Sequence, residues 1–241
     1  MSKNIVTYLS DLEASGFSAP RKFVFFDTCV VLDLIRERSH FQPNNVNYFK
    51  AYQKLITAIQ EQQVFAVSSY MVDTEIRSNY DDRKTEFNSA YNNAINKIKA
   101  LQALAKYQGN IKRRVNYNDR YRTFTKAEKM YNELYRLITF FEEKIEYDQF
   151  AMQHVLHKLI PAHAEHEYKD AFIWGNCLDF KNLTHEEDKI YFFTTNTNDY
   201  VINDKISLAE RSRLQERLDG ECGGKIEIIA NIFALEGKLF H

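Results

Sequence analysis

Four acidic residues of the sequence either follow an apolar run or open an amphipathic one, and they are Asp27, Glu75, Asp170 and Asp199. Carboxylate oxygens are the ligands that Mg²⁺ and Mn²⁺ prefer, and Mg²⁺ takes only a few of them while keeping several waters. Such an ion can activate a water and stabilise the charge that develops when a phosphodiester is displaced in line. The set is therefore suited to metal-assisted hydrolysis.

Each of these acids also has a structural explanation. Asp170 can stabilise the N-terminus of the helix it opens, Asp199 can form an Asx turn, and Glu75 can be surface charge. Asp27 is the hardest to explain in this way, because it directly follows the apolar residues 23–26. An unpaired charge at the end of a buried strand is costly and requires a cation or a hydrogen-bond partner.

Short apolar runs alternate with amphipathic stretches, and they predict the elements that position these acids. Strands are expected at 22–28, 64–67, 190–193 and 226–229, and helices at 29–37, 46–62, 70–80, 168–180 and 208–218. This alternation implies a parallel sheet covered by helices on both faces. Ligand sites in such sheets form at the carboxyl ends of strands, where Asp27 and Asp199 are expected.

The stretch between the second and third expected strands has helical periodicity. Two apolar stripes carry it: Phe87, Tyr91, Ala94, Ile95, Ile98 and Ala105, then Met130, Leu134, Leu137, Phe141 and Ile145. Residues 125–128 between them have the form of a capping box, which would start a helix. We therefore expect residues 1–241 to form a single α/β domain with a helical insertion over 82–162.

The bulk composition restricts partners and compartment. The net charge of −1 means that any binding of nucleic acid must depend on a local basic patch. The N-terminus lacks the pattern of a signal peptide, and no apolar run is long enough to span a bilayer. The three cysteines form no CxxC pair, which argues against a disulfide framework or a structural zinc site. A soluble cytoplasmic protein is expected.

Four segments of the sequence, in this order, resemble the motifs of the PIN (PilT N-terminus) domain nucleases. They are Phe23–Leu34 with Asp27 and Thr28, Val67–Ile76 with Glu75, Lys169–Trp174 with Asp170, and Tyr191–Tyr200 with Asn196 and Asp199. The resemblance covers both ends of the fold but none of the residues between Glu75 and Asp170. It implies a PIN-like α/β fold with a longer insert than small members of the family have.

The resemblance also implies a metal-dependent endonuclease that uses Mg²⁺ or Mn²⁺, prefers RNA over DNA, and leaves a 5′-phosphate and a 3′-hydroxyl. The residues it assigns to metal binding and catalysis are Asp27, Glu75, Asp170 and Asp199. Thr195 and Asn196 would give polar support, and Lys169 would either contact the scissile phosphate or be solvated. The family includes toxins of toxin–antitoxin modules, RNA-processing enzymes and defence-linked nucleases.

One position departs from the family pattern, because many members carry aspartate where Asn196 stands. Either Asp199 supplies a fourth carboxylate, or the site works with three. This departure leaves open an alternative function, a catalytically silent PIN-like module that binds RNA or a protein. A haloacid-dehalogenase-like phosphatase is disfavoured, because its chemistry requires an aspartate at position 29, where this chain has cysteine.

A basic segment at 106–122 is the expected nucleic-acid contact, through Lys112, Arg113, Arg114 and Arg120. Lysines and arginines can hold phosphates and the interleaved tyrosines can stack on bases, although a solvated linker explains the segment equally well. The four histidines His154, His157, His163 and His166 are expected to form a surface cluster rather than a zinc site. The exposed insertion is compatible with a homodimer or with an inhibitory protein partner, and no membrane partner is expected.

Overall fold

A computed structural model describes residues 4–18, 20–36, 45–107, 120–162, 168–196, 200 and 207–240. Within them, five parallel strands form one sheet: β1 (Lys22–Phe26), β2 (Phe65–Ser69), β3 (Thr139–Phe141), β4 (Lys189–Phe193) and β5 (Ile226–Ile229). The strand order is β3-β2-β1-β4-β5. The predicted parallel α/β fold is therefore confirmed.

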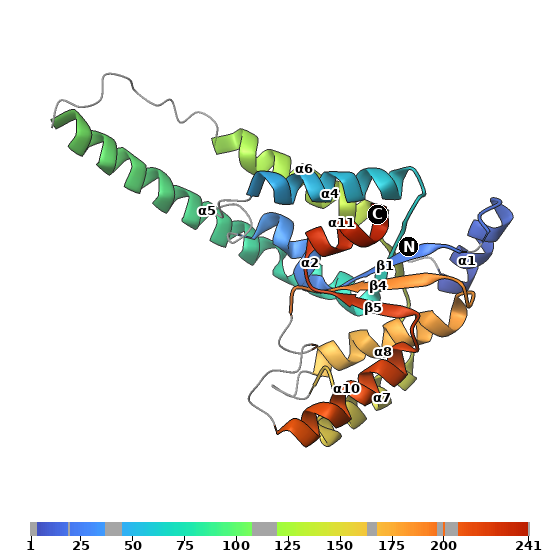
Figure 1. Ribbon diagram of the computed structural model, residues 1–241. Coiled ribbons are helices and arrows are strands. Elements are labelled where there is room, and N and C mark those ends of the chain that lie inside the picture. Colours follow the sequence, from blue (N-terminus) through green and yellow to red (C-terminus); the bar gives the residue numbers. More distant parts are fainter. Residues whose placement is uncertain are drawn as a thin grey trace.

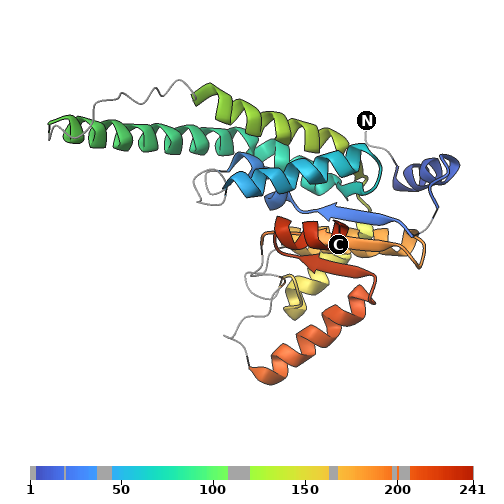
Figure 2. The ribbon, with the colours of Figure 1, turned by 45° about the horizontal axis from the view of Figure 1, so that its top comes forward.

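Helices cover both faces of the sheet (Figures 1 and 2). On one face lie α2 (Thr28–Leu32), α4 (Asn45–Gln60), α6 (Arg120–Leu137) and α11 (Ile232–Phe240). On the other face lie α7 (Ile145–His157), α8 (Tyr168–Leu183) and α10 (Leu208–Cys222). The remaining elements are α1 (Ile5–Ala14), the short 3₁₀ helix η1 (Asp33–Ile35) and the long α5 (Tyr70–Tyr107). No helix in this described part combines the length and apolarity that a bilayer crossing needs.

Aromatic residues of the central strands pack between the two helical layers. Phe23 and Phe25 of β1 are fully buried, and the Phe25 ring lies 5.6 Å from the ring of Phe192 on β4. Phe180 of α8 meets Phe23 edge-on at 5.1 Å. Burial of each such ring stabilises the fold by about 1.5–3 kcal/mol, which explains why the apolar run before Asp27 forms the centre of the sheet.

The strand connections run in opposite directions from the middle of the sheet. The chain passes from β1 outward through β2 to β3, then returns to the other side of β1 and continues through β4 to β5. The carboxyl ends of β1 and β4 thus meet at a topological switch point, where the Asp27 N–H donates to the Phe193 carbonyl at 3.0 Å. Such points are the usual ligand sites of parallel α/β sheets.

The expected helical character of the middle of the chain is confirmed by α5, α6 and α7, but the edge strand β3, which pairs with β2, was not expected there. Two further expectations for this stretch were wrong. The stripe through Phe141 and Ile145 is not one helix, since α6 ends at Leu137; a short apolar run has no period that separates strand from helix. Residues 125–128 lie inside α6 and cap nothing. The insertion boundaries and the single domain over 1–241 stay predictions.

Candidate active site

Asp27 lies at the carboxyl end of β1 and is only 4% exposed. Its Oδ1 accepts a hydrogen bond from the Thr28 N–H at 2.6 Å, which makes Asp27 the N-cap of α2. Its Oδ2 accepts from the Thr194 hydroxyl at 2.6 Å and from the Cys29 thiol at 3.1 Å. A carboxylate has about four lone-pair positions, so these three bonds leave room for one more donor or a cation.

The electrostatic surroundings of Asp27 favour its neutral form. Burial raises the pKa of this carboxyl above its usual value, and the charge of Glu75 raises it further, while the bonds from Thr194, Cys29 and Thr28 lower it. A cation at the site would offset both effects that raise the pKa.

Glu75 reaches the same edge of the sheet from the second turn of α5. Its Oε2 accepts from the Thr28 hydroxyl at 2.6 Å, so Thr28 bridges the two carboxylates through its backbone N–H and its side chain. Its Oε1 lies 2.9 Å from Nζ of Lys169, whose side chain is 58% exposed. The side chain of Glu75 itself is 16% exposed, which leaves it accessible from solvent.

Asp170 lies in the first turn of α8, where the positive end of the helix dipole favours a carboxylate. Its Oδ2 lies 3.4 Å from Nδ2 of Asn196, which donates to it. The Asn196 N–H in turn donates to the Thr194 hydroxyl at 3.0 Å, and that hydroxyl donates to Asp27. A continuous polar chain therefore connects Asp170 to Asp27.

Asn196 acts here as a donor to a carboxylate. An aspartate at this position would repel Asp170, whereas the amide holds it. Tyr200 adds a second contact, because its hydroxyl donates to the Asp170 carbonyl at 3.5 Å. At position 196, where many members of the family carry a carboxylate, this chain therefore has an amide that orients the carboxylate of Asp170.

Four polar residues of this edge received no role from the sequence: Thr28, Cys29, Asp33 and Thr194. The Thr195 hydroxyl donates to Asp33 Oδ2 at 2.9 Å, and the Thr195 N–H donates to Cys29 Sγ at 3.2 Å. Thr28, Cys29 and Asp33 fall within the first PIN-like motif and Thr194 within the last. Their positions beside strand ends were the signal that could have identified them.

The predicted site residues that the structure brings to one edge are Asp27, Glu75, Lys169, Asp170, Thr195 and Asn196. Asp199, Lys112, Arg113 and Arg114 lie outside the described residues, as does the side chain of Arg120, the first residue of α6.

The donor set fits a hard divalent cation in kind, because Asp27, Glu75 and Asp170 offer only oxygen. Among the described residues, however, no group of three Asp, Glu, His or Cys side chains stands close enough to hold one ion. Lys169 already lies against Glu75 as a positive charge.

His154 was expected at the surface, and this was wrong. The side chain is 1% exposed, with Nδ1 2.7 Å from the Ile160 carbonyl and Nε2 3.9 Å from Glu221 Oε1. Burial lowers its pKa. His154 is therefore part of the packing between α7 and α10, while His163 and His166 lie outside the described residues.

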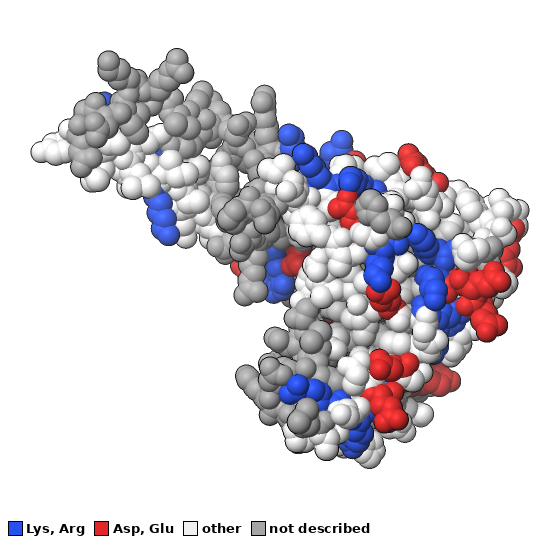
Figure 3. All heavy atoms as spheres, in the orientation of Figure 1, with Lys and Arg blue, Asp and Glu red and all other residues white. Residues whose placement is uncertain are grey.

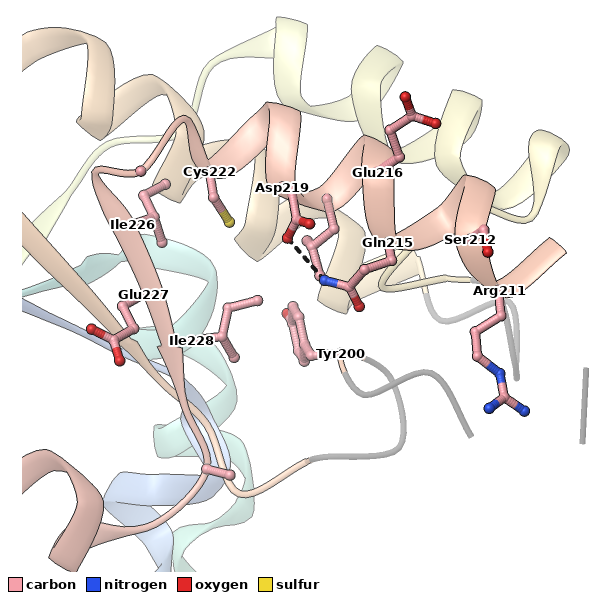
Figure 4. A pocket seen from close by; sticks show the side chains of 13 residues that line it. Tyr200, Arg211, Ser212, Gln215, Glu216, Asp219, Cys222, Ile226, Glu227 and Ile228 are labelled. Atoms are coloured by element: carbon pink, nitrogen blue, oxygen red, sulfur yellow. Dashed lines mark hydrogen bonds between the residues drawn. The ribbon is translucent and has the colours of Figure 1, made fainter. Parts of the chain in front are cut away.

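A hollow of about 1120 Å³ lies between β5 and α10 (Figure 4). Its lining includes Tyr200, Arg211, Gln215, Asp219 and Cys222, with Gln215 donating to Asp219 at 2.9 Å. The hydroxyl of Tyr200 in this lining donates to the Asp170 carbonyl. Asp27, Glu75 and Asp170 do not line the hollow, so we do not assign the chemistry to it.

Comparison with protein families identifies the fold. A model of the PIN domain matches residues 24–200, which is most of the chain and runs from β1 to Tyr200. The protein belongs to the PIN domain family. PIN domains are usually nucleases and generally use divalent metal ions. Comparisons with curated proteins and with solved structures gave no match.

Proposed function

We propose that this PIN domain is a metal-dependent endonuclease that hydrolyses phosphodiester bonds in RNA. The observation that supports the proposal is that Asp27, Glu75 and Asp170, from three different elements, are linked along one edge of the sheet by shared hydrogen-bond donors. Hydrogen bonds from Thr28, Thr194 and Asn196 orient these acids, as outer partners orient the ligands of a cation, and a bound cation would draw the three carboxylates closer together.

Asp27, Glu75 and Asp170 would hold Mg²⁺ or Mn²⁺, with Asp199 completing the acidic pocket. When bound, the ion would supply an activated water and neutralise charge on the phosphate. Thr28 positions Glu75, and Thr194 positions Asp27. Lys169, which is largely exposed beside Glu75, is suited to contact the scissile phosphate. The products would carry a 5′-phosphate and a 3′-hydroxyl.

The basic segment with Lys112, Arg113, Arg114 and Arg120 would hold the RNA outside the catalytic edge. Phosphate contacts make nucleic-acid binding weaken with salt. Charge reversal at Arg113 and Arg114 is therefore expected to weaken binding and to flatten its salt dependence. Unchanged binding would remove this segment from the proposal. A toxin or defence-type role is the biological setting that this activity would suit.

The test is cleavage of a 5′-labelled single-stranded RNA by the full chain in Mg²⁺, in Mn²⁺ and in EDTA. Cleavage is expected only with metal, and we expect it to fall at least about a hundredfold in Asp27→Asn, Glu75→Gln and Asp170→Asn. Asp219→Asn, an exposed acid on α10, is the matched control and should cleave like the parent. RNA binding without metal-dependent cleavage would favour the catalytically silent module instead.

A further inference from the structure

The helix α5 extends far beyond the helix that packs against it. With 38 residues at 1.5 Å each, it is about 57 Å long, whereas α6 has 18 residues. Figures 1 and 2 both show α6 beside the inner part of α5, while the outer part projects past it. We call residues 94–107 the outer arm.

The inner part of α5 shows what kind of surface packs there. Phe87 is 1% exposed, and the rings of Tyr80 and Tyr131 of α6 lie 5.1 Å apart. One acid of α6 accompanies this apolar contact: Glu128 accepts from the Tyr80 hydroxyl at 2.6 Å and pairs with Lys84 at 3.0 Å. The partner of α5 in this region is thus an amphipathic helix with an acid at the edge of its apolar face.

The apolar face by which α5 packs against α6 continues along the outer arm, and we call this line of apolar residues the seam. Ala94, Ile98, Leu101 and Ala105 follow Phe87 and Tyr91 at alternating spacings of four and three residues, the pattern of a helix that packs against another helix. Within the described part of the chain, Ile98 and Leu101 of this seam are 41% and 66% exposed, and Leu104, which lies beside the seam on the side of Lys97, is 62% exposed. Adjacent exposed apolar residues of this kind are typical of an interaction surface. Most of the stability of a helix in a protein comes from packing of its apolar face, and this segment of α5 lacks such packing among the described residues.

Charge restricts what can cover this seam. Residues 87–107 contain Lys97, Lys99 and Lys106 and no acid. At 3.6 residues per turn, Lys97 lies on one side of the seam and the other two lysines on the opposite side. Figure 3 shows blue and no red on the described atoms of the outer arm in that view.

Two occupants from this chain are disfavoured by the same charge. If the outer arms of two copies packed together, the three lysines of one arm would lie against the same three lysines of the other and repel them. Residues 108–119, between α5 and α6, carry the three cations Lys112, Arg113 and Arg114 against the single acid Asp119. Nucleic acid would match the lysines, but it gives no reason for the exposed Ile98, Leu101 and Leu104. A complementary surface must be both apolar and acidic.

We propose that the outer arm docks an amphipathic helix of a partner protein, with an apolar face flanked by Asp or Glu. This helix would lie along the outer arm as α6 lies along the inner part of α5, and its acids would face Lys97, Lys99 and Lys106. The proposal does not depend on nuclease activity, because Ile98 lies 23 residues, or about 35 Å, along α5 from Glu75.

The test uses the full chain and two synthetic 21-residue helical peptides with leucine at the seam positions. One peptide carries glutamate at the flanking positions and the other carries lysine. We expect the glutamate peptide to bind at least about tenfold more tightly in fluorescence anisotropy. Ile98→Ser with Leu101→Ser should weaken this binding about tenfold or more, and circular dichroism checks that the variant is folded. Reversal of the three lysines to glutamate should transfer the preference to the lysine peptide.

The matched control reverses three exposed lysines elsewhere, Lys50, Lys126 and Lys158, and should bind the glutamate peptide like the parent. The proposal is overturned if that peptide does not bind, or if the serine variant binds it unchanged. Binding of a 20-nucleotide single-stranded RNA that is lost on lysine reversal but indifferent to the serine changes would assign the arm to nucleic acid. A concentration-dependent dimer in light scattering that the serine changes abolish would assign it to a second copy.

Discussion

Two buried aspartates at opposite ends of the sheet should respond in opposite ways to the same substitution. Asp188 precedes β4 and is fully buried, and its carboxylate accepts from the Arg21 N–H at 2.8 Å and from its guanidinium at 2.9 Å. Asp27 lies at the other end of the neighbouring strand. Within the described residues it accepts hydrogen bonds from Thr28, Cys29 and Thr194, and no cation pairs with it.

Asp188→Asn removes the buried charge partner of the Arg21 guanidinium and leaves it only the half-exposed Glu13, at 3.9 Å. Losing one member of a buried pair costs about 3–5 kcal/mol. Asp27→Asn removes a charge that burial disfavours. Because the native pKa of Asp27 is raised, the native state loses stability as pH rises from the unfolded pKa to the native one. Above the native pKa the full loss of native stability is present, and it amounts to about 1.4 kcal/mol for each unit by which the native pKa exceeds the unfolded one. Asparagine is also as good an N-cap as aspartate.

The assay is urea unfolding of the parent and both variants at pH 7.5 in EDTA. We expect Asp27→Asn to be at least as stable as the parent and Asp188→Asn to be lower, with a gap between them of more than about 3 kcal/mol. Saturating Mn²⁺ should then stabilise the parent, by about 2.7 kcal/mol at a hundredfold excess over Kd, and Asp27→Asn much less. If Asp27→Asn loses as much stability in EDTA as Asp188→Asn, Asp27 is a structural residue and the reasoning is refuted.

Three further substitutions test individual contacts. Thr194→Val removes the hydroxyl bonded to the carboxylate at the end of β1 and should lower the free energy of unfolding by about 2 kcal/mol; an unchanged urea midpoint would contradict this. His154→Asn should flatten the dependence of the free energy of unfolding on pH. The pKa of His154 is lowered in the native state, so below about pH 6.5 the unfolded chain takes up the proton first. The parent therefore loses up to about 1.4 kcal/mol of stability per pH unit there, and the variant does not. Gly175→Ala places Cβ 2.8 Å from a Phe ring of α7 and should lower Tm through a loss of about 1–3 kcal/mol, whereas Gly237→Ala, with open space around it, should not.

The sequence predicted those parts of the fold whose signal is local. The apolar run of β1 is recognisable because both faces of a central parallel strand are buried. The strand β3 was missed because three residues, Thr139–Phe141, carry no period of their own and follow a helical stripe. Its place in the sheet depends on pairing with β2, which is far away in the sequence.

The acidic residues of the site could be predicted from the sequence, but most of the hydrogen-bond partners that position them could not. Asp27 and Asp170 could be found from their positions at element ends. That Thr28 serves both Asp27 and Glu75, or that Asn196 donates to Asp170, depends on side-chain directions that follow only from the packed fold. The exposed outer arm was likewise hidden, because its heptad spacing alone does not reveal how far along α5 the helix α6 reaches.

The most direct test of the account is anomalous diffraction from crystals soaked in Mn²⁺. The central claim is that Asp27, Glu75 and Asp170 together hold a divalent cation at the switch point of the sheet. We predict a strong peak within about 2–2.5 Å of carboxylate oxygens from at least two of these residues, with Lys169 moved away from Glu75. A saturated soak with no peak between them, or with Mn²⁺ bound only elsewhere, would contradict the claim.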